Sequence, residues 1–219
     1  MFRELLVAAC SKFGYEVVAA ASTGADAVEA IVGMRPDVAI LDLVLPDMDG
    51  FAVVEAARAR GGRTRILAVS SRCDEHTVYR IERAAFSGFL DKQAAAVDEL
   101  RRAMEVVSSG GLYFSRAFLA IQQKEHANPH AFQKILSRSQ QVVLGMIGDL
   151  CDDHDVGRRL GISHHTAEKH RFRIMHRLGL RSRDELLRYA RRRGFTSLTA
   201  DESGAVPGVF PPAGLDLFP

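Results

Sequence analysis

Residues 38–50 read Val-Ala-Ile-Leu-Asp-Leu-Val-Leu-Pro-Asp-Met-Asp-Gly, and they predict the fold of the first half of the chain. The apolar run 38–41 is typical of a strand buried on both faces of a parallel sheet. Asp42 then lies at the carboxyl edge of that sheet, where open α/β folds place their binding sites. An aspartate after a strand can also serve only as a helix cap, so the residues that accompany Asp42 determine its role.

The same alternation of short apolar runs and amphipathic stretches continues on both sides of this segment. We expect strands at 16–19, 66–69 and 88–90, and helices near 24–32, 50–60, 74–84 and 94–108. Strands and helices that alternate with short connections predict an α/β fold, a doubly wound parallel sheet, over residues 1–108. Ser70 and Lys92 close the next two strands, so both are expected at the same edge as Asp42.

The second half of the chain has a different pattern. Residues 109–133 contain a Ser-Ser-Gly-Gly break and a polar stretch, and are expected to be a linker. Residues 134–194 are expected to form an all-α domain. Within it, a short helix over 153–160, a glycine-containing turn, and a longer helix capped by Ser163 predict a helix-turn-helix. The proline-rich residues 195–219 are expected to be a disordered tail.

Composition and charge support this division. The 219 residues are 47% hydrophobic and 26% charged, as in ordinary globular proteins. No apolar run approaches the ~18 residues of a membrane span, and three scattered cysteines suit the cytoplasm. Residues 1–115 carry 13 basic and 16 acidic side chains, whereas 134–194 carry 14 basic and 7 acidic ones. The excess of positive charge in the helical part favours a nucleic-acid partner.

Asp42, Ser70, Lys92 and the turn 45–50 together resemble the receiver domain of a two-component response regulator. The resemblance implies a flavodoxin-like fold and a phosphoacceptor role for Asp42, with a histidine kinase as the partner. Ser70 and Lys92 would bind the phosphoryl group, and Phe89 would be the aromatic switch residue. Asp47 and Asp49 also resemble the paired aspartates of a phosphatase family, but Pro46 places them in a loop, so we expect no enzyme.

The first residues depart from this family. Receivers begin with a strand that ends in an acidic pair, which holds Mg²⁺ together with the phosphoacceptor. Here residues 1–6 already match the first helix, so Asp42 and Val44 would form only part of a metal site. Mg²⁺ is expected as a cofactor only if the acidic pair exists upstream of Met1. Either the start is assigned incorrectly or trimmed, or the receiver is degenerate and works without phosphorylation.

Residues 156–180 resemble the LuxR-type (NarL/FixJ) DNA-binding domain, whose partner is double-stranded DNA. On the helix after Ser163, Ala167, Ile174 and Leu178 share the core face. The residues that project away from it are candidates for contact with base edges: His165, Glu168, Lys169, Phe172 and His176. Those expected near phosphates are Thr166, His170, Arg171 and Arg173.

This half also departs from its family. Val142 replaces the usual acidic residue and Leu150 the usual glycine, while Asp152, Asp153 and Asp155 add acidic charge that would repel a phosphate backbone. The amphipathic helix 182–190 is either the dimer contact of this family or a helix that packs only on its own domain. We therefore expect a cytoplasmic, dimeric, DNA-binding response regulator. The alternatives are a phosphorylation-independent regulator and a protein-interaction adaptor.

Overall fold

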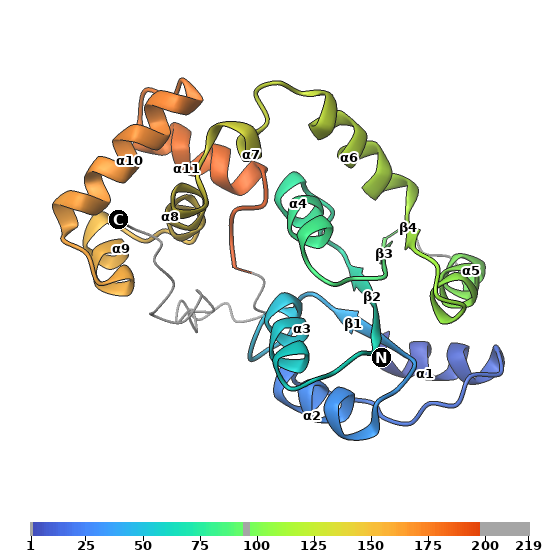
Figure 1. Ribbon diagram of the computed structural model, residues 1–219. Helices are drawn as coiled ribbons and strands as arrows, with labels where there is room; N and C mark the ends of the chain where they lie inside the picture. Colours follow the sequence, from blue (N-terminus) through green and yellow to red (C-terminus); the bar gives the residue numbers. More distant parts are fainter. Residues whose placement is uncertain (1, 94–96, 198–219) are drawn as a thin grey trace. The chain divides into compact units, whose positions relative to one another are not determined.

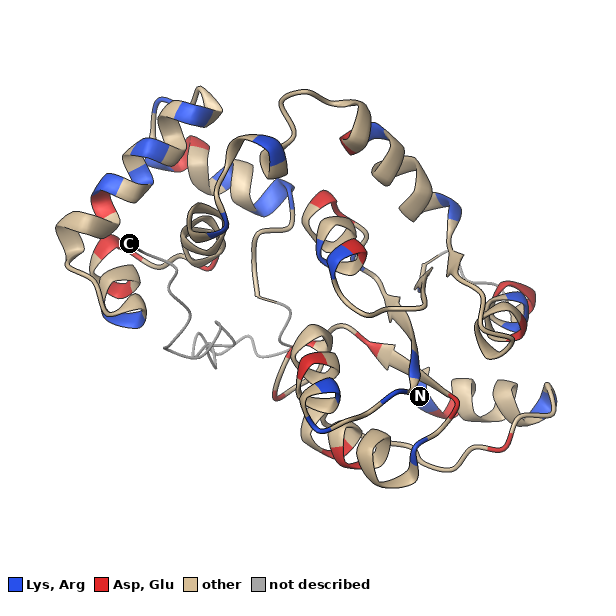
Figure 2. Cartoon of the chain, viewed as in Figure 1, with Lys and Arg blue, Asp and Glu red and all other residues tan. Residues whose placement is uncertain are grey.

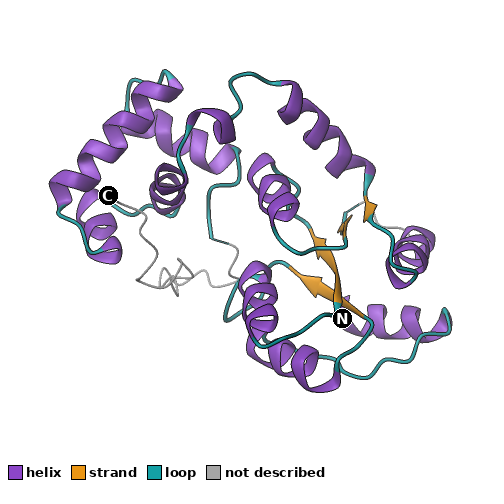
Figure 3. Cartoon of the chain, in the orientation of Figure 1, coloured by secondary structure: helices purple, strands orange, loops and turns teal. Residues whose placement is uncertain are grey.

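The computed structural model describes residues 2–93 and 97–197. The chain divides into two compact units, the first built largely from residues up to Ala120 and the second largely from Ile121 onward. Figure 3 shows strands only in the first of these and helices throughout the second. Within the described ranges, no helix combines the length and the apolar character that crossing a membrane requires.

A parallel four-stranded sheet organises the first unit (Figure 1). Its order is β1-β2-β3-β4, and its members are β1 (Val38–Asp42), β2 (Arg65–Ser70), β3 (Gly88–Asp91) and β4 (Tyr113–Phe114). The helices between and beside them are α1 (Phe2–Lys12), α2 (Gly24–Met34), α3 (Gly50–Ala59), α4 (Glu75–Arg83) and α5 (Val97–Ser108). This is the parallel α/β architecture that the alternation of apolar and amphipathic segments predicts.

Side chains from α1 and α5 pack together with side chains of β2 in one buried apolar cluster. Leu67 and Val69 of β2 are buried there with Cys10 of α1 and Met104 of α5. Because side chains alternate along a strand, Ser70 lies on the opposite side of the sheet from Val69. The apolar residues of β2 are therefore buried as their periodicity predicts, and the polar Ser70 lies at the end of the strand.

The strand expected at 16–19 does not form, and that prediction was wrong. In the described chain these residues have no regular structure, and Val17 and Val18 are exposed. Among the described strands, β1 pairs only with β2. A β-branched run becomes a strand only if a neighbouring strand takes up its hydrogen bonds, and no described strand lies next to this one.

Regular structure also occurs in the segments next to the two expected domains. Residues 109–133, the expected linker, contain β4, α6 (Arg116–Ala127) and the start of α7 (Phe132–Ile135). Gly110 has a φ of 93°, and the turn that it allows brings Tyr113 beside Gly88. At the other end, Phe195 is fully buried in the core of the second unit, so the ordered part extends beyond Gly194. The rest of the expected tail, 198–219, lies outside the described residues.

Four helices form most of the second unit: α8 (Arg138–Gly148), α9 (Asp153–Leu160), α10 (His164–Leu178) and α11 (Arg183–Arg192). Ser137 and Asp152 each begin a helix with a capping box, and Ser163 and Ser182 cap the other two. Gly161 and Gly179 end α9 and α10 in the left-handed conformation. The predicted helix-turn-helix is thus confirmed, because each cap that its sequence indicates is used.

Leu150 occupies the turn between α8 and α9 with a φ of 66°, and the residue is 62% exposed. A left-handed conformation costs an ordinary residue about 1–2 kcal/mol, whereas glycine adopts it freely. We expect Leu150→Gly to raise the free energy of unfolding by about 1 kcal/mol in urea denaturation. Leu150→Ala retains the Cβ and is the matched control, which should give no gain. Equal stabilities of the two variants would contradict this explanation.

Candidate functional site

Three predicted residues meet at the carboxyl edge of the sheet. Asp42 ends β1, Ser70 ends β2, and Lys92 directly follows β3. The Lys92 ammonium forms an ion pair with the Asp42 carboxylate, and the Lys92 backbone N–H donates to the Ser70 carbonyl at 2.9 Å. Asp42 Oδ1 also accepts a hydrogen bond from the Val44 backbone at 3.0 Å. Ser70 is fully buried, and its Oγ accepts a hydrogen bond from the Arg72 N–H at 3.1 Å, so the accessible groups at this edge are the Asp42 carboxylate and the Lys92 ammonium.

The loop after Asp42 is held by two further carboxylates. Asp47 accepts hydrogen bonds from the backbone N–H groups of Gly24 and Ala25, at 2.6 and 2.9 Å, at the start of α2. Desolvation raises the pKa of Asp47, but these and other backbone N–H groups outweigh it and leave the pKa below its ordinary value. Asp47 and Asp49 both lie in the loop that follows Pro46, as the sequence predicts. Asp47 attaches this loop to the start of α2.

Asp49 caps α3 through the Ala52 N–H at 2.8 Å and forms an ion pair with Arg80 of α4 at 2.9 Å. The Arg80 guanidinium also lies 3.7 Å from the centre of the Phe51 ring. The sequence analysis did not identify Arg80, because nothing in its local pattern indicates a partner 31 residues away. The helix cap by Asp49, in contrast, is local, because an aspartate directly before a helix commonly accepts a hydrogen bond from an N–H of the first turn.

The described residues do not form the Mg²⁺ site that receivers require. Across residues 2–93 and 97–197, no group of three histidine, cysteine, aspartate or glutamate side chains could hold a metal ion. Asp42 is the carboxylate of the expected partial site, and its Oδ2 faces Lys92 instead. Val44, the other residue of the expected partial site, contacts Asp42 only through its backbone N–H. An ammonium beside one carboxylate is a poor substitute for a set of oxygen donors.

Phe89 is fully buried, and its ring centre lies 5.4 Å from that of Phe118. Phe2 was not expected near this edge, yet the Lys92 ammonium lies 4.8 Å from its ring centre. The start of α1 therefore borders the Asp42–Lys92 pair. The aromatic switch role of Phe89 stays a prediction.

The second candidate surface is the outer face of α10. Ala167 and Ile174 are buried, whereas Lys169, Phe172 and Arg173 are exposed. Figure 2 shows basic residues recurring along α10 and α11. His165 and His176 are exposed too, and Glu168 is half-buried. The helix thus separates into a packed face and a cationic face much as its sequence predicts; the one buried residue that the prediction missed is Met175.

Two residues expected near phosphates have other surroundings. His170 is half-buried, and burial lowers the pKa of its imidazole, with Arg173 lowering it further. Both effects favour the neutral imidazole over the charged one. Thr166 lies at the start of α10, where its Oγ1 is 2.9 Å from Ser163 Oγ. The phosphate contacts expected of His170 and Thr166 stay predictions.

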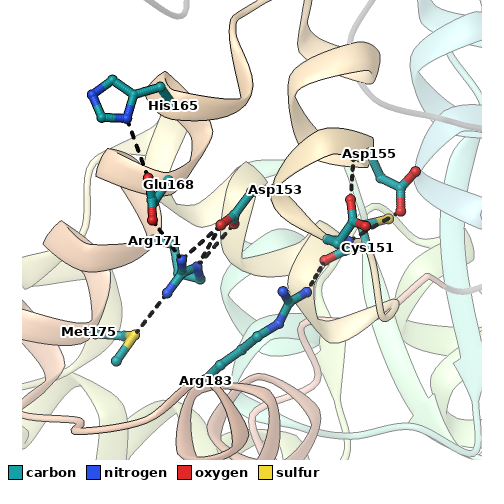
Figure 4. Close-up of polar contacts among 9 residues, drawn as sticks. Cys151, Asp153, Asp155, His165, Glu168, Arg171, Met175 and Arg183 are labelled. Carbon is teal, nitrogen blue, oxygen red and sulfur yellow. Dashed lines mark hydrogen bonds and ion pairs between the residues drawn. The ribbon is translucent and has the colours of Figure 1, made fainter.

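Arg171 is directed at α9 (Figure 4). Its guanidinium donates three hydrogen bonds to the Asp153 carboxylate, at 2.8 to 3.1 Å. The two remaining aspartates of this region, Asp152 and Asp155, form the capping box of α9. The acidic residues that appeared unfavourable for DNA binding therefore each have a partner within the domain.

Two family models match the chain. The response regulator receiver domain matches residues 1–105, and bacterial regulatory proteins, luxR family, matches residues 134–190. The oxygen regulatory protein NreC of Staphylococcus aureus (strain MRSA252) is 28% identical over 184 residues, which cover 80% of this chain and 84% of NreC.

Solved structures agree with the fold. A structure of the Salmonella typhimurium RcsB response regulator matches 86% of this chain and 93% of its own, with a TM-score of 0.53 and 16% identity. A structure of two RcsB dimers bound to two parallel DNAs matches 87% of this chain and 93% of its own, with a TM-score of 0.57 and 17% identity. At these identities the likeness shows the fold alone.

Proposed function

Since the chain belongs to the NarL/FixJ family of response regulators, which join a receiver domain to a LuxR-type DNA-binding domain, we propose that it regulates transcription through α10 in the major groove of duplex DNA. We further propose that Asp42 accepts a phosphoryl group from a histidine kinase and that the protein acts in the cytoplasm.

The exposed cationic face of α10 is the observation that carries the DNA-binding proposal. Lys169 has the length and charge to donate to the acceptor edge of guanine, and Arg173 to pair with a phosphate. Phe172, 55% exposed, offers an apolar surface to a thymine methyl group. Exposed aromatic and basic side chains on the second helix of a helix-turn-helix are the chemistry that this mode of recognition requires.

We propose a homodimer on a two-fold operator, in keeping with the RcsB dimers on DNA. α11 is the candidate dimer contact. Its Leu186 and Ala190 are fully buried in the domain core, so a partner would meet the opposite face, which includes Arg188. One face of α11 can therefore pack on its own domain while the opposite face contacts a second copy of the chain.

For the receiver, the proposed chemistry is transfer of a phosphoryl group to the Asp42 carboxylate. The bond between phosphorus and the imidazole nitrogen of the kinase's phosphohistidine breaks as an Asp42 carboxylate oxygen bonds to phosphorus. Lys92 would then exchange its carboxylate partner for the phosphoryl oxygens, and the Ser70 hydroxyl would donate to one of them. The alternative is a receiver that acts without phosphorylation, in which the Asp42–Lys92 ion pair is only a structural contact.

Mass spectrometry after incubation with acetyl phosphate and Mg²⁺ tests the receiver's role. We expect one phosphoryl group on the full chain and none on Asp42→Asn. Asp91→Asn removes a carboxylate from the end of β3, which β2 separates from β1, and is the matched control, which should be labelled like the natural chain. An unlabelled natural chain that still binds DNA would contradict phosphorylation of Asp42 and support the alternative.

A further inference from the structure

The contact between Asp153 of α9 and Arg171 of α10 is well formed and largely shielded. Arg171 Nε lies 3.0 and 3.1 Å from the two carboxylate oxygens, and Nη2 lies 2.8 Å from Oδ2. The two side chains are only 18% and 13% exposed, respectively. Bidentate pairs of this kind fix direction as well as distance, because the planar guanidinium matches the carboxylate.

The same guanidinium contacts several residues of its own helix (Figure 4). Nη2 lies 3.7 Å from Glu168 Oε1, and Glu168 Oε2 lies 3.4 Å from His165 Nδ1. The Arg171 guanidinium carbon also lies 4.6 Å from the centre of the Phe172 ring. A continuous series of polar contacts therefore leads from Asp153, on the first helix of the motif, to His165 on the exposed face of the second.

We propose that Asp153 and Arg171 are a positioning pair, which sets the orientation of Glu168, Phe172 and His165 and so determines which DNA sequence is preferred. Neither member of the pair contacts the DNA. The proposal rests on the DNA-binding function proposed above. It replaces the phosphate contact expected for Arg171 and the repulsion expected from Asp153.

These two explanations of Asp153 predict opposite effects. If Asp153 only repels phosphates, removing its charge strengthens DNA binding. If it positions Arg171, removing its charge weakens binding and relaxes the preference for particular bases. The salt dependence distinguishes a direct phosphate contact by Arg171 from a positioning role. Removing one phosphate contact lowers the slope of log affinity against log salt by about 1.

The test compares Asp153→Asn, Arg171→Gln and the double variant in the full chain. The probe is a duplex that the natural chain selects from a random library, and affinity is measured by fluorescence anisotropy at several salt concentrations. Asp152→Asn is the matched control, because it removes the same charge from the same turn and asparagine still caps a helix. Thermal unfolding of each variant verifies that it is folded.

We expect Asp153→Asn and Arg171→Gln each to weaken binding about tenfold, with an unchanged salt slope and a relaxed base preference. The double variant should be no weaker than either single one, because the two side chains act as a unit. Asp152→Asn should keep its preference and bind at least as tightly. If Asp153→Asn proves unfolded, Arg171→Gln leaves the α9 cap untouched and gives the same comparison.

Binding by Asp153→Asn as tight as by Asp152→Asn would overturn the positioning pair, and so would a salt slope lowered by about 1 in Arg171→Gln alone. If the natural chain selects no duplex at all, the proposed function itself fails, and the positioning pair fails with it.

Discussion

Gly148→Ala is expected to lower the free energy of unfolding of the helical unit by about 2–3 kcal/mol. Gly148 is the last residue of α8, and a Cβ there would lie 1.7 Å from the Phe195 carbonyl oxygen and 2.9 Å from its carbon. Both atoms belong to the backbone, so no side-chain rotation relieves the clash. Phe195 is fully buried, and moving it would open the core that it shares with Phe132 and Ile147.

Gly145→Ala in the same helix is the matched control. A Cβ at Gly145 would meet no described atom within 4 Å, so the substitution exchanges a poor helix former for a good one. It should stabilise the unit by about 0.5–1 kcal/mol. Urea denaturation of the two variants measures both effects, and their opposite signs are the expected result. Equal stability of Gly148→Ala and the natural chain would contradict the close approach to Phe195.

Lys169→Ala combined with Arg173→Ala is expected to weaken binding to the selected duplex by about 100-fold. Both side chains are exposed on the outer face of α10. Each substitution would remove one of the proposed charge-assisted hydrogen bonds, and loss of the proposed Arg173–phosphate contact would lower the salt slope by about 0.9. The measurement is fluorescence anisotropy at several salt concentrations.

The control removes two exposed cations elsewhere. Arg63→Ala with Arg102→Ala changes the net charge equally but lies in the receiver half of the chain. We expect that variant to bind within about twofold of the natural chain. A weakening as large as that of the α10 variant would mean that total charge, and not the surface of α10, governs the affinity.

Local signals made most of the fold predictable. The helix-turn-helix follows from Ser163 and Gly179, because a cap is defined by residues within one turn of it. The sheet edge follows from the strand periodicity, which places Asp42 and Ser70 at neighbouring strand ends. The Asp42–Lys92 contact follows in turn, since parallel strands share one carboxyl edge.

The failures concern features that depend on distant residues. The expected strand at 16–19 has the right composition, but a strand exists only with a hydrogen-bonded neighbour. The turn at Gly110 resembles a domain end, although it returns the chain to the sheet as β4. Neither outcome is determined by the residues adjacent to it in the sequence.

The candidate site shows the same limit. Helical periodicity places Arg171 away from the core, and a charged residue there is naturally interpreted as a DNA contact. Its actual partner, Asp153, is 18 residues away on another helix. Periodicity gives the face of a side chain but not its partner, so pairs between helices require the packed structure.

Selection of duplexes from a random library by the full chain tests the proposed function most directly. We expect enrichment of a two-fold symmetric sequence. The affinity for it should fall as salt rises and should be about 100-fold weaker in the Lys169→Ala, Arg173→Ala variant. The contradicting result is a chain that enriches no sequence at low salt, or one whose enrichment is the same after both substitutions.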